Sequence, residues 1–366
     1  MNRHLLCFAV WITIAGCAMN EPAPEETEQV SALITAPQWL VARIAANGTV
    51  ATQAGSGASL TAMPHNATGF YVLTASGITP TAGNILVTPI GGSAHCVVGT
   101  WLPSNGRTQI QVWCFAPVTA AVVDSAFSLS YVFDNRTATS SDQIRAAYVK
   151  YPGTGSSVTS SFTWSSIGGP GATFFVSNPA PGQFHVIIPG MAVPPGLLPA
   201  STVQTTAFGD FKYCNVTGAR NGGNFATDRT VDVSCFDATG TPANAAFTLR
   251  MWTAPSYGAQ DGMCVYNSMP GATYIPGAFD ESTTGSSAVS FTCATILSHT
   301  TCTINAPGLS LASSAALIDA TESDGRYCNA LALSGSVGIQ YQCYTPAGAP
   351  ANATFSAAYL DGILGL

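Results

Sequence analysis

The sequence contains few charged side chains. Asp, Glu, Lys and Arg make up 8 % of its 366 residues, against about 25 % in an ordinary soluble protein. Basic residues are the scarcer kind, with 11 Lys and Arg against 18 Asp and Glu, and they form no cluster. A protein that binds nucleic acid needs a concentrated positive surface to displace counterions from the phosphates. We therefore expect no nucleic-acid partner.

Long hydrophobic runs are also absent. No stretch approaches the length of about 20 apolar residues that a membrane-spanning helix needs. Hydrophobic residues nevertheless make up 47 % of the chain, so there is ample material for a packed core, and this composition is unlike that of a disordered protein. The 36 Gly and 23 Pro are typical of many short strands joined by turns.

Motifs of catalysis and metal binding are missing. The chain has no G-x-S-x-G, H-E-x-x-H, P-loop or C-x-x-C motif. The sequence therefore predicts no catalytic residue, no metal site and no cofactor. The histidines lie in polar or turn contexts and are expected to be solvent-facing or locally hydrogen-bonded: His65, His95, His185 and His299. Near the C terminus, Glu322 and Asp324 resemble part of a calcium loop, but Ala320 occupies the place of its first Asp.

The N terminus has the pattern of an export signal. Residues 1–17 read MNRHLLCFAVWITIAGC, with Arg3 before an apolar run that is too short to span a bilayer. Two small residues then precede Cys17, as at a cleavage site. We predict that residues 1–16 are a signal peptide.

The segment Ile14-Ala15-Gly16-Cys17 resembles the lipobox of bacterial lipoproteins. That resemblance implies a lipid on Cys17, and several acyl chains anchor a protein stably where one does not. It also implies a place in the cell envelope, and Ala18 after the cysteine favours the outer membrane or cell surface over the inner membrane. An ordinary secretory signal is the alternative. Residues 17–36 are acidic at first and contain proline, so they are expected to be a flexible tether.

The remainder of the chain is a threefold repeat. Each copy has a cysteine, a turn-rich gap and a second cysteine followed by an aromatic residue, and then a phenylalanine 12 or 13 residues later: Phe127, Phe247 and Phe355. Upstream, the segments GFYVLTASG, GQFHVIIPG and TTCTINAPG align without gaps and place Tyr71, Phe184 and Cys302 at one position. The repeats span residues 37–135, 140–255 and 258–366, and each is long enough for its own core.

The segments within each repeat are rich in β-branched and aromatic residues, and no segment has the pattern of an amphipathic helix. We predict an all-β protein of three tandem antiparallel β-sandwich domains, immunoglobulin-like in type. A small barrel is the alternative. The paired cysteines and the phenylalanine-rich strand resemble a tandem module of uncharacterised secreted bacterial proteins. That resemblance implies no activity.

Six of the cysteines fit cross-strand disulfides. In an antiparallel hairpin that sets Cys96 opposite Cys114, Val98 faces Val112 and Thr100 faces Ile110. Opposed residues lie close enough for a disulfide, and an exported protein is oxidised. The predicted pairs are Cys96–Cys114, Cys214–Cys235 and Cys328–Cys343.

Three cysteines remain besides Cys7 and Cys17. We prefer a fourth bond between Cys293 and Cys302 with Cys264 free, while pairs of Cys264 with either one stay open. In the hairpin register Trp101 and Trp113 lie on the face opposite the disulfide, where they would form an aromatic binding face if exposed. Packing against a neighbouring strand or domain is the preferred alternative for them.

These features predict a non-catalytic surface lipoprotein with a structural, adhesive or ligand-binding role. Its expected partners are the membrane, through the lipid on Cys17, and a polysaccharide or another envelope protein. A carbohydrate-binding accessory protein and an extracytoplasmic enzyme of unrecognised type are the alternatives.

Overall fold

The computed structural model describes residues 38–65, 67–79, 82–135, 146–193, 201–253, 262–267, 281–282, 290–296, 299–305, 315–334 and 338–360. The predicted signal peptide, Cys17 and the tether lie outside these residues. Contacts divide the chain into two units, Met1–Ile34 and Thr35–Leu366. The described part contains strands and turns but no helix, and therefore no helix that could cross a membrane. The all-β prediction is confirmed.

The first repeat contributes eight strands: β1 (Gln38–Ile44), β2 (Val50–Gly55), β3 (Ser59–Ala62), β4 (Phe70–Ser76), β5 (Asn84–Ile90), β6 (His95–Ser104), β7 (Arg107–Phe115) and β8 (Ala126–Phe133). The second contributes β9 (Ala146–Tyr151), β10 (Ser157–Val158), β11 (Thr163–Ser165), β12 (Gly169–Pro170), β13 (Phe174–Ala180), β14 (Gln183–Ile188), β15 (Ser201–Phe208), β16 (Lys212–Asn221), β17 (Arg229–Asp237) and β18 (Ala246–Thr253). The third contributes β19 (Gly262–Asn267), β20 (Glu281–Ser282), β21 (Ser290–Ile296), β22 (His299–Asn305), β23 (Ala315–Ala320), β24 (Tyr327–Ser334), β25 (Gly338–Tyr344), β26 (Pro350–Ala351) and β27 (Phe355–Leu360).

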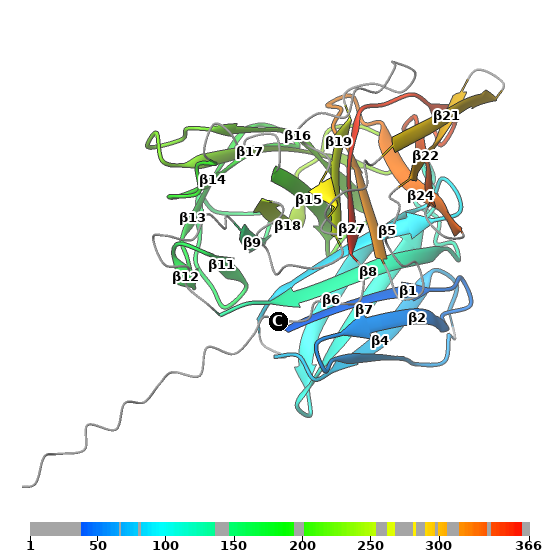
Figure 1. The fold of residues 1–366 in the computed structure, drawn as a ribbon, viewed down its shortest axis with the longest axis horizontal. Helices are drawn as coiled ribbons and strands as arrows, with labels where there is room; N and C mark the ends of the chain where they lie inside the picture. Colours follow the sequence, from blue (N-terminus) through cyan, green and yellow to red (C-terminus); the bar gives the residue numbers. More distant parts are fainter. Residues whose placement is uncertain are drawn as a thin grey trace, which may run out of the picture. The chain divides into compact units, whose positions relative to one another are not determined.

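Two of the four sheets cross the boundaries between repeats (Figure 1). One runs β2-β1-β8-β5-β24-β25-β22-β21, with β26 beside β25, and joins the first repeat to the third. Another runs β12-β11-β9-β18-β15-β6-β7-β4-β3 and joins the second repeat to the first. The other two run β10-β13-β14-β17-β16 and β20-β19-β27-β23. The three repeats therefore pack together within one unit and share sheets with one another.

The repeated cysteines lie on antiparallel hairpins, as predicted. Disulfides join Cys96 to Cys114, Cys214 to Cys235 and Cys328 to Cys343, with Cα atoms 4.1, 4.0 and 3.9 Å apart. All six cysteines are buried among the apolar residues of their own repeats. The predicted position shared by Tyr71, Phe184 and Cys302 is also confirmed, because each pairs with the residue two places before the second cysteine: Val112, Val233 and Tyr341.

A bulge interrupts each of these hairpins three residues after its first cysteine. In the first repeat Val98 faces Val112 as predicted, but the extra residue Gly99 makes Thr100 face Gln111 and brings Trp101 opposite Ile110. A bulge re-aims the side chains that follow it. Trp101 is therefore on the disulfide side and belongs to the buried core, with 1 % of its surface exposed, so the outward orientation predicted for it is wrong.

Candidate functional site

Three equivalent strands, one from each repeat, meet inside the molecule: β5, β15 and β23. The residues Pro89, Ala207 and Ala320 on these strands pair with the shared phenylalanines Phe127, Phe247 and Phe355. The residues just before them are therefore equivalent, and they are Thr88, Thr206 and Asp319. All three are buried.

These side chains link the repeats in a closed cycle of hydrogen bonds. The backbone N–H of Val87 donates to Thr206 Oγ1 at 3.0 Å, from the first repeat to the second. The N–H of Thr205 donates to Asp319 Oδ2 at 2.5 Å, from the second to the third. The N–H of Ile318 donates to Thr88 Oγ1 at 3.2 Å, from the third back to the first. The cycle implies an approximate threefold axis.

A second cycle lies on the partner strands β8, β18 and β27. Thr248 Oγ1 donates to the carbonyl of Ile85 at 2.7 Å, and Ser356 Oγ donates to the carbonyl of Val203 at 3.2 Å. Ser128 Oγ accepts the N–H of Ala316 at 3.3 Å. Buried polar groups need hydrogen-bond partners, and in both cycles the inner strand of each repeat finds them for its backbone groups on one neighbouring repeat.

Three aromatic rings form a triangle at the junctions between neighbouring repeats. They belong to the residues just before the first cysteine of each repeat: His95, Tyr213 and Tyr327. The His95 ring lies 4.1 Å from that of Tyr213 and 4.0 Å from that of Tyr327, measured between centroids, and the two tyrosine rings are 5.4 Å apart. The prediction that His95 is solvent-facing or locally bonded is wrong. His95 occupies the position that Tyr213 and Tyr327 occupy in the other repeats. It therefore lies in the interior, with 4 % of its surface exposed.

Two of the three junctions have matching polar contacts. Tyr213 donates its hydroxyl hydrogen to the carbonyl of Gly325 at 2.6 Å, and Tyr327 donates to that of Ser93 at 2.7 Å. The amide of Asn215 donates to the carbonyls of Glu322 and Arg326, and that of Asn329 donates to those of Gly92 and Ala94.

At the equivalent positions of the remaining junction, between the first repeat and the second, the contacts are apolar. Val97 replaces the asparagine, and Phe211 packs against Trp113 and Phe115 with ring centroids 5.5 and 5.4 Å away. Because it packs against a neighbouring repeat, Trp113 is half-buried.

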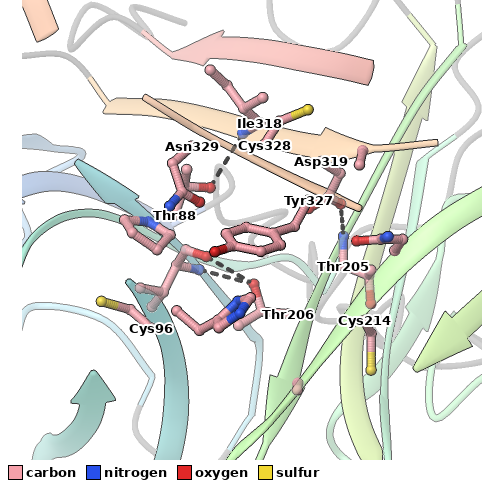
Figure 2. A pocket seen from close by; sticks show the side chains of 16 residues that line it. Thr88, Cys96, Thr205, Thr206, Cys214, Ile318, Asp319, Tyr327, Cys328 and Asn329 are labelled. Atoms are coloured by element: carbon pink, nitrogen blue, oxygen red, sulfur yellow. Dashed lines mark hydrogen bonds between the residues drawn. The ribbon is translucent and has the colours of Figure 1, made fainter. Parts of the chain in front are cut away.

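A cavity of about 40 Å³, which we call the axial cavity, lies among the three junctions. Figure 2 shows Thr88, Thr206, Asp319 and Tyr327 around it, with dashed lines marking the hydrogen bonds of the first cycle. Its described lining also includes His95, Asn215 and Asn329, and it contains no Lys or Arg. The cavity is large enough for about two or three water molecules.

Burial raises the pKa of Tyr327 in this lining, and two further titratable groups there are also strongly perturbed. Burial raises the pKa of the Asp319 carboxyl well above its ordinary value, and the N–H of Thr205 opposes that rise in part. Burial also lowers the pKa of His95 to about 3, so its ring is neutral at physiological pH. His95 Nε2 is buried without a hydrogen-bond partner. Both effects follow from removing a group that can carry charge from water.

The other polar groups considered from the sequence are engaged on the surface. His65 Nε2 lies 2.8 Å from Asp124 Oδ1, which also accepts the N–H of Gly69. Hydrogen bonding from that N–H lowers the pKa of Asp124. His185 Nδ1 lies 2.6 Å from Asp232 Oδ1.

In the loop that resembles part of a calcium site, an arginine pairs with both acidic side chains. Arg326 pairs with Glu322 at 3.3 Å and with Asp324 at 2.8 Å. Among the described residues no three His, Cys, Asp or Glu side chains are placed to hold a metal ion. The side chains of Cys264 and His299 lie outside the described residues.

The fourth disulfide stays a prediction, although the strand register suits it. The backbone of Cys293 lies directly opposite Cys302 in the β21–β22 pair, and Cys302 is itself disulfide-bonded. The side chain of Cys293 lies outside the described residues. The fourth bond therefore rests on the register.

The tryptophans of the described part do not form an exposed platform. Trp113 is half-buried, and four others are buried: Trp39, Trp101, Trp164 and Trp252. A second hollow of about 370 Å³ opens beside Asp124, but its lining is mostly backbone and small side chains. Of these two hollows, the axial cavity has the more convergent polar groups.

Sequence reasoning missed this site because its members lie far apart in the chain. Comparing the repeats position by position would have singled it out, since Asp319 stands where the others have Thr, and His95 stands where the others have Tyr. No family model matches the chain, and neither the curated proteins nor the solved structures contain a significant match.

Proposed function

We propose that this protein is a lipid-anchored protein of the cell envelope whose repeats form one non-catalytic head that binds or braces another envelope component. In this proposal residues 1–16 are removed, Cys17 carries the lipid, and residues 17–36 tether the head. The head consists of three immunoglobulin-like β-sandwich domains at 37–135, 140–255 and 258–366.

The observation that carries the proposal is the closed cycle of bonds between repeats. The buried side chains of Thr88, Thr206 and Asp319 each accept a backbone N–H from a neighbouring repeat, so these groups hold the repeats together. Convergent polar groups in a cleft are what an enzyme needs. A head built from three similar repeats that pack together suits attachment to a partner.

Three further observations support an extracytoplasmic place. The lipobox-like segment ends at Cys17, the acidic residues follow it, and three disulfides lie on the repeated hairpins. Disulfides persist in oxidising compartments. The carbohydrate-binding alternative has less support, because Trp101 is buried and Trp113 packs against Phe211.

Metabolic labelling with an alkyne fatty acid, followed by membrane fractionation, tests the anchor. We expect the wild type to be labelled and to sediment with membranes, and Cys17→Ser to lose both properties. Cys7→Ser changes the other cysteine of the leader and should behave as the wild type. An unlabelled wild type would refute the anchor.

Crosslinking in living cells tests the binding role. A photo-crosslinking residue at exposed Phe225 should capture one envelope protein or glycan reproducibly, whereas the same residue at buried Leu129 should capture none. The equivalent tips of the other repeats can be compared in the same way. Hydrolysis of an envelope polymer by the purified protein would instead favour the enzyme alternative.

A further inference from the structure

The axial cavity has one carboxyl group in its lining and no cationic side chain to balance that group in its ionised form. Asp319 is its one acidic residue, its described lining includes no Lys or Arg, and no salt bridge among the described residues reaches Asp319. A buried carboxylate is strongly unfavourable unless it is protonated or paired with a cation. The cavity must therefore supply a proton or a cation.

The oxygen atoms around the cavity have acceptor capacity left over. Thr88 Oγ1 accepts one N–H, and Thr206 Oγ1 accepts one N–H and donates its hydrogen to the carbonyl of Val87 at 3.2 Å. A hydroxyl oxygen has two lone pairs, so each retains one. Asp319 uses Oδ2 for the N–H of Thr205, and a carboxylate can accept several more hydrogen bonds.

Two residues that differ from their equivalents in the other repeats line this cavity. A cycle with three threonines would be neutral, but the third repeat has Asp319 in place of Thr. The first repeat has His95 in place of Tyr, and the neutral ring of His95 has a buried Nε2 without a partner. An unpartnered buried nitrogen beside a polar cavity indicates a missing polar occupant.

We propose that the axial cavity binds one hard, oxygen-preferring cation, either sodium or calcium, through the Asp319 carboxylate and the Thr88 and Thr206 hydroxyls. Oxygen donors are the ligands that hard cations prefer. The volume of about 40 Å³ is enough for one ion and a bound water. The absence of a cluster of three His, Cys, Asp or Glu among the described residues does not bear on a site built from one carboxylate and two hydroxyls.

The occupant would stabilise the junctions because its ligands come from all three repeats. A cation that binds only the folded protein raises the melting temperature with its concentration. The proposed site stands whether or not Cys17 is acylated, so it can be tested independently of the anchor.

The test uses the full mature protein after dialysis against a chelator. Thermal unfolding is measured in choline chloride, in sodium chloride and in calcium chloride at one ionic strength. We expect sodium or calcium to raise the melting temperature by about 2–4 °C over choline, and the salt that acts identifies the ion. Equal melting temperatures in the three salts would overturn the proposal.

The variants separate this site from surface effects. Asp319→Thr introduces the residue of the other two repeats and should abolish the shift, whereas Asp210→Asn removes a surface carboxylate and should keep it. A full shift in Asp319→Thr would refute the site. If that variant does not fold, equilibrium dialysis with calcium and ²³Na line broadening on the wild type decide, and no stoichiometric binding of either ion would refute the site.

Discussion

His95 and Tyr213 occupy the same position in successive repeats, and their rings stack with centroids 4.1 Å apart and an interplanar angle of 13°. Tyr213 also donates a hydrogen bond to the third repeat. His95 makes no comparable bond, and its Nε2 has no partner. The first repeat thus fills a structural aromatic position with a titratable ring.

His95 should make the protein sensitive to acid. Its pKa is about 3 in the folded state and about 6.5 in an unfolded chain. Between these values the unfolded chain binds a proton that the folded protein does not, so stability is full above pH 6.5 and falls as the pH drops toward 3. The loss is at most about 1.4 kcal/mol per pH unit.

The variant His95→Tyr should remove that loss. Urea unfolding at pH 7 and pH 5 measures it, and we expect the variant to gain stability relative to the wild type as the pH falls. In choline chloride, where no cation binds Asp319, the raised pKa of this carboxyl has the opposite effect and makes stability fall as the pH rises above 3.8. The variant should therefore be more stable at pH 5 than at pH 7. An unchanged pH dependence would contradict the role of His95.

The first hydrogen-bond cycle should be sensitive to removal of one hydroxyl. Thr88→Val leaves the buried N–H of Ile318 without an acceptor, which costs about 1–3 kcal/mol. Thr88→Ser retains the hydroxyl and should lose less. Urea unfolding monitored by tryptophan fluorescence measures both, and equal stabilities for the two variants would contradict the prediction.

Ala120 has a backbone conformation that suits glycine. Its φ is 53°, and the equivalent residues of the other repeats are Gly240 and Gly348, with φ of 86° and 78°. A left-handed conformation costs a non-glycine residue about 1–2 kcal/mol. Ala120→Gly should therefore stabilise the protein, by less than that amount because glycine is more flexible when unfolded.

The neighbouring alanine provides the control for this substitution. Ala121 does not have a positive φ, so Ala121→Gly should destabilise by about 0.5–1 kcal/mol. Thermal unfolding distinguishes the two variants. Destabilisation by both would show that the conformation of Ala120 is not strained.

Lys150 is surrounded by aromatic rings and has no acidic partner among the described residues. Its Nζ lies 4.1 Å from the ring of Trp101, 4.7 Å from that of Phe162 and 4.1 Å from that of Phe208, measured to centroids. The rings favour the ammonium form, but burial lowers the pKa of Lys150 to about 8. Unfolding restores the ordinary value of about 10.4.

The stability of the wild type should therefore rise between pH 8 and pH 10, because only the unfolded chain keeps the proton there. Lys150→Met should lose that rise, whereas Lys212→Met, at a lysine paired with Asp210, should keep it. Measurements stop at pH 10, since burial raises the pKa of Tyr131 and Tyr344 to about 12 and their titration lowers stability above that pH.

The disulfides should be intact in the native protein and important for its stability. Mass spectrometry without reduction should find the three hairpin pairs joined. Replacing Cys328 and Cys343 together with Ala should lower the unfolding free energy by very roughly 3 kcal/mol. Recovery of these cysteines as thiols from the native protein would contradict the assignment.

The sequence allowed prediction of whatever depends on residues close in the chain or repeated along it. The hairpin disulfides, the pairing of Val98 with Val112 and the shared position of Tyr71 and Phe184 are of this kind. The bulges were not predictable, because the extra residues Gly99, Thr217 and Leu331 differ in size and polarity and so give no common sequence pattern. One such residue reversed the orientation of Trp101.

The axial cavity was not predictable for a different reason. Its hydrogen bonds join residues 114 to 230 positions apart, and no local pattern reports such distances. Asp319 lies within five residues of Glu322 and Asp324 in the sequence. In the fold, Asp319 faces inward, while the other two pair with Arg326.

The parallel contact between β5 and β24 makes the first repeat a neighbour of the last. An open tandem array can gain or lose a unit at either end without disturbing the others. Here a fourth unit would have to break the ring to enter, and loss of one would leave two unsatisfied inner strands. A duplicated unit would therefore have no equivalent place within this ring.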